Sequence, residues 1–352
     1  MWPCASLTVN SGMLRWSSSA DRHAGGVLCL IAAAVVFVAG CTDTAPVVAD
    51  PEQLIDRPPG FPEQAFPADN FPTPERVDLG KQLFFDIRMS ANRDVSCATC
   101  HDPARAFADA LPTSRGTASR QGTRNSPSLA NVGYLPYLMR EGGVPTLEMQ
   151  ILVPIQEHAE FDLEAPLLVA RLSQDSILQS KSRAAYGRPL DIWVITRSIA
   201  SFERTLVSGR SRVDAGDLSE SERRGQKIFS SAGCVSCHGG PLYTDNRFTC
   251  NGLLETYSDR GRARLTNDPA DVAVFRVPSL RNVALTAPYL HNGSVETLRE
   301  VIERYNQGGF PHPNKNATLG PLGLSALDCA DLEAFLRALT DDRFTTNPRF
   351  RP

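Results

Sequence analysis

The sequence lacks an excess of charge of either sign. Its 352 residues include 36 Lys and Arg against 39 Asp and Glu, which gives a formal net charge of -3. Nucleic-acid binding usually needs a broad basic field, and a cationic partner needs an acidic block, so we expect neither kind of ligand. Hydrophobic residues make up 42% of the chain, which is enough to bury a core, and the length favours two domains.

Long hydrophobic runs are also scarce. Residues 25–39 are apolar but too few to span a membrane comfortably, and Arg15 and Arg22 precede them. This pattern predicts a signal peptide over residues 1–40 and a periplasmic protein. The run ends at Cys41 in a sequence that resembles the lipobox of bacterial lipoproteins, so we expect a lipid anchor to the envelope membrane there. A cleaved, soluble protein is the alternative.

Cysteine is too sparse, at nine residues, for a small disulfide scaffold. Four cysteines fall in two pentapeptides of the form C-x-x-C-H, at residues 97–101 and 234–238. This spacing places two thiols on one turn, where each can add to a haem vinyl group while the adjoining His faces the iron. Two covalent haem c groups are therefore predicted, one on Cys97, Cys100 and His101 and the other on Cys234, Cys237 and His238.

Two C-x-x-C pairs also allow a different site, a zinc ion held by four thiolates. The His after each pair and the exported, oxidising context weigh against zinc. Cys250 and Cys329 are then left over. An exported protein with two unassigned cysteines most simply pairs them, so a disulfide is predicted, with two separate buried thiols as the alternative.

The chain contains an internal repeat. Short segments of the first half recur in the second in the same order, at residues 80–84 and 225–229, 127–132 and 278–283, and 136–138 and 288–290. The first pair resembles the N-terminal helices of two cytochromes c. We therefore expect a mainly α-helical protein with two cytochrome c-like haem domains in tandem and little β structure. The predicted parts are a Pro-rich tether or arm over 41–75, a first haem domain over 76–207 and a second haem domain over 208–352.

Methionine is absent after Met149, so no thioether from the second half can ligate its haem iron. Counting along the repeat pairs Pro154 in the first half with Tyr305 in the second. Phenolate is an accepted axial ligand that favours ferric iron, so Tyr305 is predicted to ligate the second iron. A core Tyr on an apolar helix face is the alternative. Pro154 has no donor atom, so the first iron is expected to stay open to a small molecule.

Two polar residues lie near Pro154 in the sequence, Gln150 one turn before it and Glu160 six residues after it. Cleavage of hydrogen peroxide needs a group that moves a proton between its oxygens, and a partly buried Glu can do so. An amide can hold the peroxide by hydrogen bonding. Gln150, Pro154 and Glu160 are therefore the predicted catalytic residues, with a solvated turn as the alternative for Glu160.

Together these motifs resemble the bacterial di-haem cytochrome c peroxidase and MauG family. The resemblance covers about residues 76 to 340 and includes the segments 147–160, 200–206 and 277–283. It implies that Gln150 and Glu160 lie in the distal pocket of the peroxidatic haem, with Glu160 as the acid–base group. It also implies one calcium ion between the haems, bound by the Asn125 side chain and the carbonyl oxygens of Thr286 and Pro288.

Two departures from the family's common pattern indicate which branch of the family the chain resembles. Tyr305 matches the MauG branch, whose members use peroxide to oxidise residues of a partner protein, and the loop after the first motif lacks the distal His of many members. The family's inter-haem Trp falls near Met139 and Arg140, which leaves Tyr134 or Tyr137 as substitutes.

The predicted function is a di-haem peroxidase that reduces hydrogen peroxide with electrons from a cytochrome c or cupredoxin. A MauG-like oxidase that acts on a specific protein partner is one alternative. A di-haem electron carrier without peroxide chemistry is the other.

Overall fold

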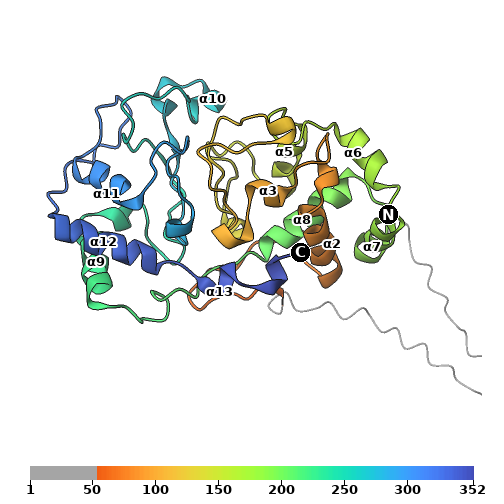
Figure 1. The fold of residues 1–352 in the computed structure, drawn as a ribbon, viewed down its shortest axis with the longest axis horizontal. Helices are drawn as coiled ribbons and strands as arrows, with labels where there is room; N and C mark the ends of the chain where they lie inside the picture. Colours follow the sequence, from red (N-terminus) through yellow and green to blue (C-terminus); the bar gives the residue numbers. More distant parts are fainter. Residues whose placement is uncertain (1–53) are drawn as a thin grey trace, which may run out of the picture. The chain divides into compact units, whose positions relative to one another are not determined.

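The computed structural model describes residues 54–352, so the predicted signal peptide and Cys41 lie outside the described residues (Figure 1). The described part is mainly helical, and its one sheet has two short antiparallel strands, β1 (Phe248–Thr249) and β2 (Phe275–Arg276). The expectation of a mainly α-helical protein with little β structure is confirmed. Within residues 54–352 no helix has the length and apolar character needed to cross a membrane.

The helices fall into two groups along the chain. The first group is α2 (Pro74–Phe84), α3 (Cys97–Cys100), α4 (Leu147–Gln150), α5 (Leu152–Gln156), α6 (Ala165–Leu172), α7 (Ser176–Tyr186) and α8 (Ile192–Arg204). The second is α9 (Glu220–Ser231), α10 (Ala263–Thr266), α11 (Leu298–Asn306), α12 (Ala326–Ala338) and α13 (Asp342–Thr345). Short 3₁₀ helices connect them: η1 (Ile87–Met89), η2 (Pro103–Arg105), η3 (Thr117–Ser119), η4 (Val132–Tyr134), η5 (Cys234–Ser236), η6 (Pro269–Asp271), η7 (Val283–Leu285) and η8 (Pro348–Phe350).

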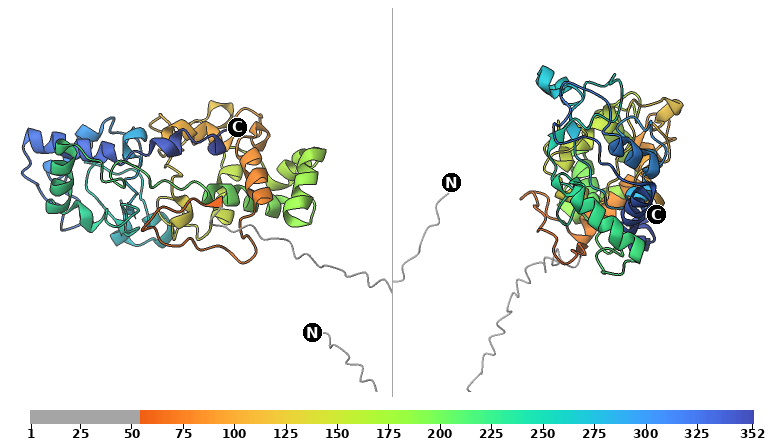
Figure 2. Two further views of the ribbon diagram at one scale, coloured as in Figure 1. Left: turned by 90° about the horizontal axis from the view of Figure 1, so that it is seen from below. Right: turned by 90° about the vertical axis from the view of Figure 1, so that its left-hand side faces the viewer.

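The internal repeat takes the same form in both halves. Helix α2 packs on α8 and α9 packs on α12, as the views from different sides agree (Figures 1 and 2). Each pair meets at a glycine: a Cβ on Gly80 would lie 1.8 Å from the Ser198 carbonyl oxygen, and one on Gly225 would lie 1.9 Å from that of Asp331. The close approach of the two backbones therefore explains why glycine stands at this position in both copies of the repeat.

Replacing Gly225 with Ala should destabilise the protein strongly, because the new methyl group overlaps backbone that belongs to another helix. Overpacking of this kind costs about 1–3 kcal/mol or more, so a clear fall in Tm by circular dichroism is expected. Gly320→Ala is the control, since a Cβ there has no atom within 4 Å. Equal Tm values for the two variants would contradict the packing described for α9 and α12.

The buried apolar side chains form two main clusters, one in each half. The first surrounds α2 and α8, and the second lies between α9, α11 and α12. The C-terminal segment returns to the first cluster: the rings of Phe344 and Phe350 lie 5.7 and 6.2 Å from that of Phe107. The last residues, assigned from the sequence to the second domain, thus help to build the core of the first half.

The arm that precedes α2 is fixed to the first half by buried amides. Gln64 Nε2 donates to the carbonyl oxygen of Arg204 at 3.0 Å. Asn70 Nδ2 donates to Glu148 Oε1 at 2.6 Å and to the carbonyl oxygen of Arg197 at 3.0 Å. The described end of the Pro-rich segment therefore lies along the protein surface and contributes to its packing.

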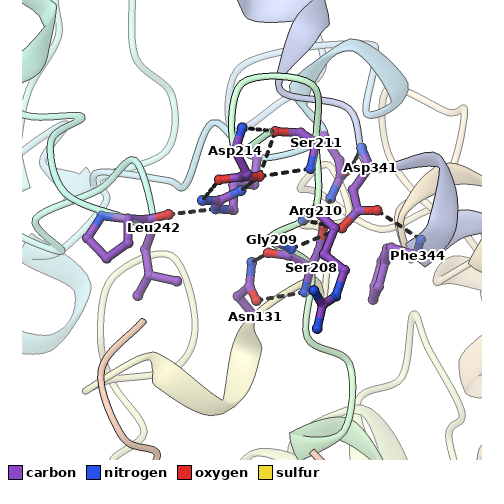
Figure 3. Close-up of polar contacts among 12 residues, drawn as sticks. Asn131, Ser208, Gly209, Arg210, Ser211, Asp214, Leu242, Asp341 and Phe344 are labelled. Atoms are coloured by element: carbon purple, nitrogen blue, oxygen red, sulfur yellow. Dashed lines mark hydrogen bonds and ion pairs between the residues drawn. The ribbon is translucent and has the colours of Figure 1, made fainter. Parts of the chain in front are cut away.

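The linker between the halves is held by residues from both copies of the repeat. Asn131 Nδ2 donates to the Ser208 carbonyl oxygen at 2.8 Å, and Asn282 Nδ2 donates to Ser208 Oγ at 2.9 Å. Asp341 Oδ2 accepts from Ser208 Oγ and from the Gly209 and Arg210 amides, at 3.1, 2.9 and 2.9 Å (Figure 3). These contacts anchor the linker to the first half, to the second half and to the segment before α13.

Candidate active site

One cavity in the first half gathers all six residues that the sequence assigned to the first site, namely Cys97, Cys100, His101, Gln150, Pro154 and Glu160. Apolar side chains complete its wall, among them Met89, Leu129, Ile151, Ile155 and Phe161. The cavity therefore combines two thiols, one imidazole and several polar side chains with a largely apolar lining.

Helix α3 positions the two thiols and the imidazole. It begins with a capping box, in which Ser96 N donates to Thr99 Oγ1 at 3.0 Å. His101 ends the helix, and its Nδ1 lies 2.9 Å from the carbonyl oxygen of Phe107. That contact holds the proton on Nδ1 and leaves Nε2 free to bind a metal. Burial lowers the pKa of His101, so the ring is neutral, which is the form that ligates iron.

The thiols of this site suit covalent haem attachment. Cys97 and Cys100 are free and face the same cavity as His101. Burial raises the pKa of Cys97 well above its usual value and that of Cys100 to about 11, so both are protonated at neutral pH. Two neighbouring thiols and a neutral imidazole around one apolar cavity match the donor set of a c-type haem.

The opposite wall of the cavity comes from α4, α5 and the turn that follows. Thr146 caps α4 by accepting a hydrogen bond from Met149 N at 3.3 Å, and Gln150 and Pro154 then lie one turn apart. A backbone hydrogen bond holds the turn that carries Glu160, because Thr117 N donates to the Glu160 carbonyl oxygen at 2.7 Å. Burial and the neighbouring Glu157 raise the pKa of Glu160 to about 7. Glu160 can therefore both accept and release a proton near neutral pH.

A second carboxylate, Glu203, lines the same cavity, although the sequence analysis gave it no role. It lies on α8 and is 5% exposed, and within residues 54–352 its Oε2 has no hydrogen-bond partner. Burial raises its pKa to about 8, although the adjacent Arg204 lowers it. The sequence feature that could have identified Glu203 is its position beside the apolar stripe of the helix, which places a charged side chain next to the core.

The second half repeats the arrangement around His238. Its Nδ1 lies 3.2 Å from the Tyr243 carbonyl oxygen and 3.1 Å from that of Pro278, and burial lowers its pKa. The neighbouring thiols of Cys234 and Cys237 are free, and burial raises the pKa of Cys234. The second motif therefore offers the same donors as the first.

Tyr305 extends from α11 toward this second motif. Burial raises its pKa to about 12, the nearby Cys234 and Cys237 act in the same direction, and a hydrogen bond with the Asn251 side chain opposes them. Asn251 is itself held by Tyr257, whose hydroxyl donates to its Oδ1 at 3.1 Å. In the first half Pro154, which the internal repeat pairs with Tyr305, lines the cavity and offers no donor atom.

The predicted disulfide between Cys250 and Cys329 is wrong, because both are free, buried thiols. Cys250 Sγ lies 3.7 Å from Nδ1 of His312, in a small cluster that includes Val274. Cys329 lies on α12 in the larger core of the second half. The segment after the second motif packs on the loop beyond α11 rather than on α12, which separates the two sulfurs.

Asn125, a predicted calcium ligand, lies where the two halves meet. Its N–H donates to the carbonyl oxygen of His291 at 2.8 Å. Thr286 and Pro288, the other predicted ligands, lie on the loop that leads to His291. In residues 54–352 no group of three or more His, Cys, Asp or Glu side chains is placed to bind a metal ion.

Comparisons with known proteins confirm the family resemblance. A family model for di-haem cytochrome c peroxidase matches residues 74–223, and one for a RoxA-like, cytochrome c-like domain matches residues 274–307. Cytochrome-c peroxidase IdrP1 of Denitromonas iodatirespirans is 34% identical over 320 residues, which cover 80% of this chain and 85% of that protein. Methylamine utilization protein MauG of Methylorubrum extorquens is 33% identical over 336 residues, which cover 88% and 94%.

A similar solved structure is that of a MauG-like protein associated with microbial copper homeostasis. It superposes with a TM-score of 0.80 at 34% identity, over 84% of this chain and 98% of the other. The likeness thus spans both copies of the C-x-x-C-H motif. On these grounds the chain belongs to the di-haem cytochrome c peroxidase and MauG family and is an oxidoreductase of the cytochrome-c peroxidase type.

Proposed function

We propose that the protein reduces hydrogen peroxide at the cavity of the first half and relays electrons to it through the second half. The observation that carries the proposal is that Gln150, Pro154 and Glu160 line the same cavity as the first C-x-x-C-H motif. Haem bound through Cys97 and Cys100 would supply an iron that changes its oxidation state, and His101 would be the side chain that binds this iron. The second haem would be held by Cys234, Cys237, His238 and Tyr305.

The residues of the cavity have distinct tasks in this reaction. Gln150 holds the peroxide through its amide. Glu160 takes the proton from one peroxide oxygen and returns it to the other, which leaves as water. Over the whole reaction one peroxide, two electrons and two protons give two waters. Pro154 keeps its side of the cavity open because its side chain has no donor atom.

The second half serves as the entry point for electrons. Tyr305 would supply a hard, anionic ligand that stabilises ferric iron, so this site stores oxidising equivalents better than a Met-ligated one. We infer that the electron donor is a periplasmic cytochrome c or cupredoxin. Export by the segment 1–40 and anchoring at Cys41 would place the protein at the envelope membrane.

Tyr305 itself favours a second candidate function, a MauG-like oxidase that modifies residues of a partner protein. The relatives support both candidates, since a cytochrome-c peroxidase and a MauG protein are 34% and 33% identical to this chain. The two candidates share the peroxide chemistry of the first half and differ in the source of electrons. A protein that only carried electrons would need neither an acid–base residue nor an open cavity beside its first haem. The cavity with Glu160 therefore favours peroxide chemistry.

The experiment that tests the proposal mixes the holoprotein with peroxide and an excess of reduced cytochrome c. We expect peroxide to disappear with oxidation of two equivalents of cytochrome c for each peroxide. Peroxide loss without oxidation of cytochrome c or a reduced cupredoxin would favour the MauG-like oxidase instead. If peroxide persists while cytochrome c still exchanges electrons with the protein, the peroxidase proposal is wrong.

A further inference from the structure

The two halves meet at a cluster of arginines around Asn125. The Arg140 guanidinium donates three hydrogen bonds to Asn125: Nη2 lies 2.7 Å from its carbonyl oxygen and 3.0 Å from its side-chain Oδ1, and Nε lies 3.2 Å from the same carbonyl oxygen. The Arg140 carbonyl oxygen accepts from Arg276 N of the second half at 2.7 Å. Arg140 therefore binds both an Asn of the first half and the backbone of β2.

The orientation of the Asn125 amide is fixed. Its Nδ2 donates to the Leu111 carbonyl oxygen at 3.1 Å, so Oδ1 faces the Arg140 guanidinium. Oδ1 is the oxygen that the family resemblance assigns to calcium. In this structure a permanently charged N–H donor already uses it, together with the carbonyl oxygen of the same residue.

The acidic side chains of this region are already paired with another arginine. Arg124 forms a salt bridge with Glu141. It also forms a bidentate salt bridge with Asp259, in which Nε lies 2.6 Å from Oδ2 and Nη2 lies 3.0 Å from Oδ1. In the part of the chain that the structure describes, neither Arg140 nor Arg276 has a carboxylate within salt-bridge distance. Arg276 donates from Nη1 to Asn246 Oδ1 at 3.2 Å, and its buried Nε has no partner there.

The balance of charge in this cluster is positive. Three guanidiniums, of Arg124, Arg140 and Arg276, face two carboxylates. His291 adds no further charge at neutral pH, because burial lowers its pKa to about 4. Calcium prefers six to eight oxygen ligands, drawn from carboxylates, backbone and amide carbonyls and waters. A site whose side-chain oxygen already accepts from a guanidinium, and which lies among three guanidiniums and two carboxylates of the chain, does not fit this ion.

We propose that the Arg140 guanidinium takes the place of the calcium ion expected between the two sites and acts as the fixed cation that joins the halves. The joint is therefore built entirely from the chain itself. The Tm of the protein and the spin states of both haems are therefore independent of the calcium concentration. A calcium-loaded member of the family would depend on calcium for both.

The first test measures calcium in the holoprotein. After dialysis against a calcium chelator and then against buffer, elemental analysis is expected to find no stoichiometric calcium. Adding millimolar calcium should change neither Tm nor the electron paramagnetic resonance spectrum, because a ligand that binds the folded state would raise Tm. Calcium retained at one ion per chain, or a Tm that rises with calcium, would overturn the proposal.

The second test uses Arg140→Met, which removes the charge but keeps an apolar stem. Loss of the guanidinium leaves the two Asn125 oxygens without their donor, so we expect a lower Tm that calcium partly restores. Arg337→Met is the matched control, because among residues 54–352 that exposed arginine forms a salt bridge only with Glu333 on its own helix. A Tm for Arg140→Met equal to that of the wild type, with no response to calcium, would show that Arg140 is not the cation of the joint.

Discussion

Replacing Glu160 with Gln is expected to lower peroxide turnover by about 10²-fold or more, because an amide cannot carry the proton between the two peroxide oxygens. Both haems should stay attached, since the thiols and histidines are untouched. Steady-state oxidation of reduced cytochrome c gives the turnover, and a pyridine haemochrome assay gives the haem content. Turnover near that of the wild type would show that Glu160 is not the acid–base residue.

Glu157→Gln is the control for this variant and also tests the electrostatics of the site. Glu157 is exposed and raises the pKa of Glu160, which is about 7. Glu160 must be deprotonated to accept the peroxide proton, so wild-type turnover should rise as the pH increases through that value. Glu157→Gln should keep its turnover and shift the rise to lower pH, whereas Glu160→Gln should lose the rise altogether.

Replacing Tyr305 with Met should raise the reduction potential of the second haem by about 100 mV or more, because a thioether favours ferrous iron and a phenolate favours ferric iron. A spectroelectrochemical titration measures this potential. The first haem should keep its potential, since its cavity contains no residue of α11.

Tyr289→Phe is the control in the same half. It removes a hydroxyl whose one hydrogen bond within the described residues goes to the Val283 carbonyl oxygen, at 3.0 Å, so the second haem should keep its potential. If Tyr305→Met leaves the second potential and its electron paramagnetic resonance signal unchanged, Tyr305 is a core residue rather than a ligand.

The sequence was most informative where chemistry requires a fixed local spacing. The C-x-x-C-H motifs lie within single turns, so they specify two thiols and an imidazole without knowledge of the fold. The internal repeat extended this information to pairs of positions, and the structure places Gly80 and Gly225 in equivalent helix contacts. Pro154, Gln150 and Glu160 came together for the same reason, because two consecutive short helices, α4 and α5, and the turn after them carry all three.

Contacts between segments far apart in the chain could not be predicted in this way. Cys250 and Cys329 were paired by elimination, but long-range packing puts them in different clusters. Glu203 was given no role, because charges are seldom buried without a partner and nothing in the local sequence shows its place in the cavity. Phe344 and Phe350 pack in the first core although the sequence analysis assigned them to the second domain. In each case the decisive neighbour belongs to another element.

The central claim is that the two sites differ, with an open iron in the first half and an iron capped by Tyr305 in the second. Electron paramagnetic resonance of the fully oxidised holoprotein tests this claim most directly. We predict one high-spin haem, which also shifts on adding azide, and one low-spin haem, which does not. Two low-spin haems before any ligand is added would contradict the assignment of Pro154 and Tyr305.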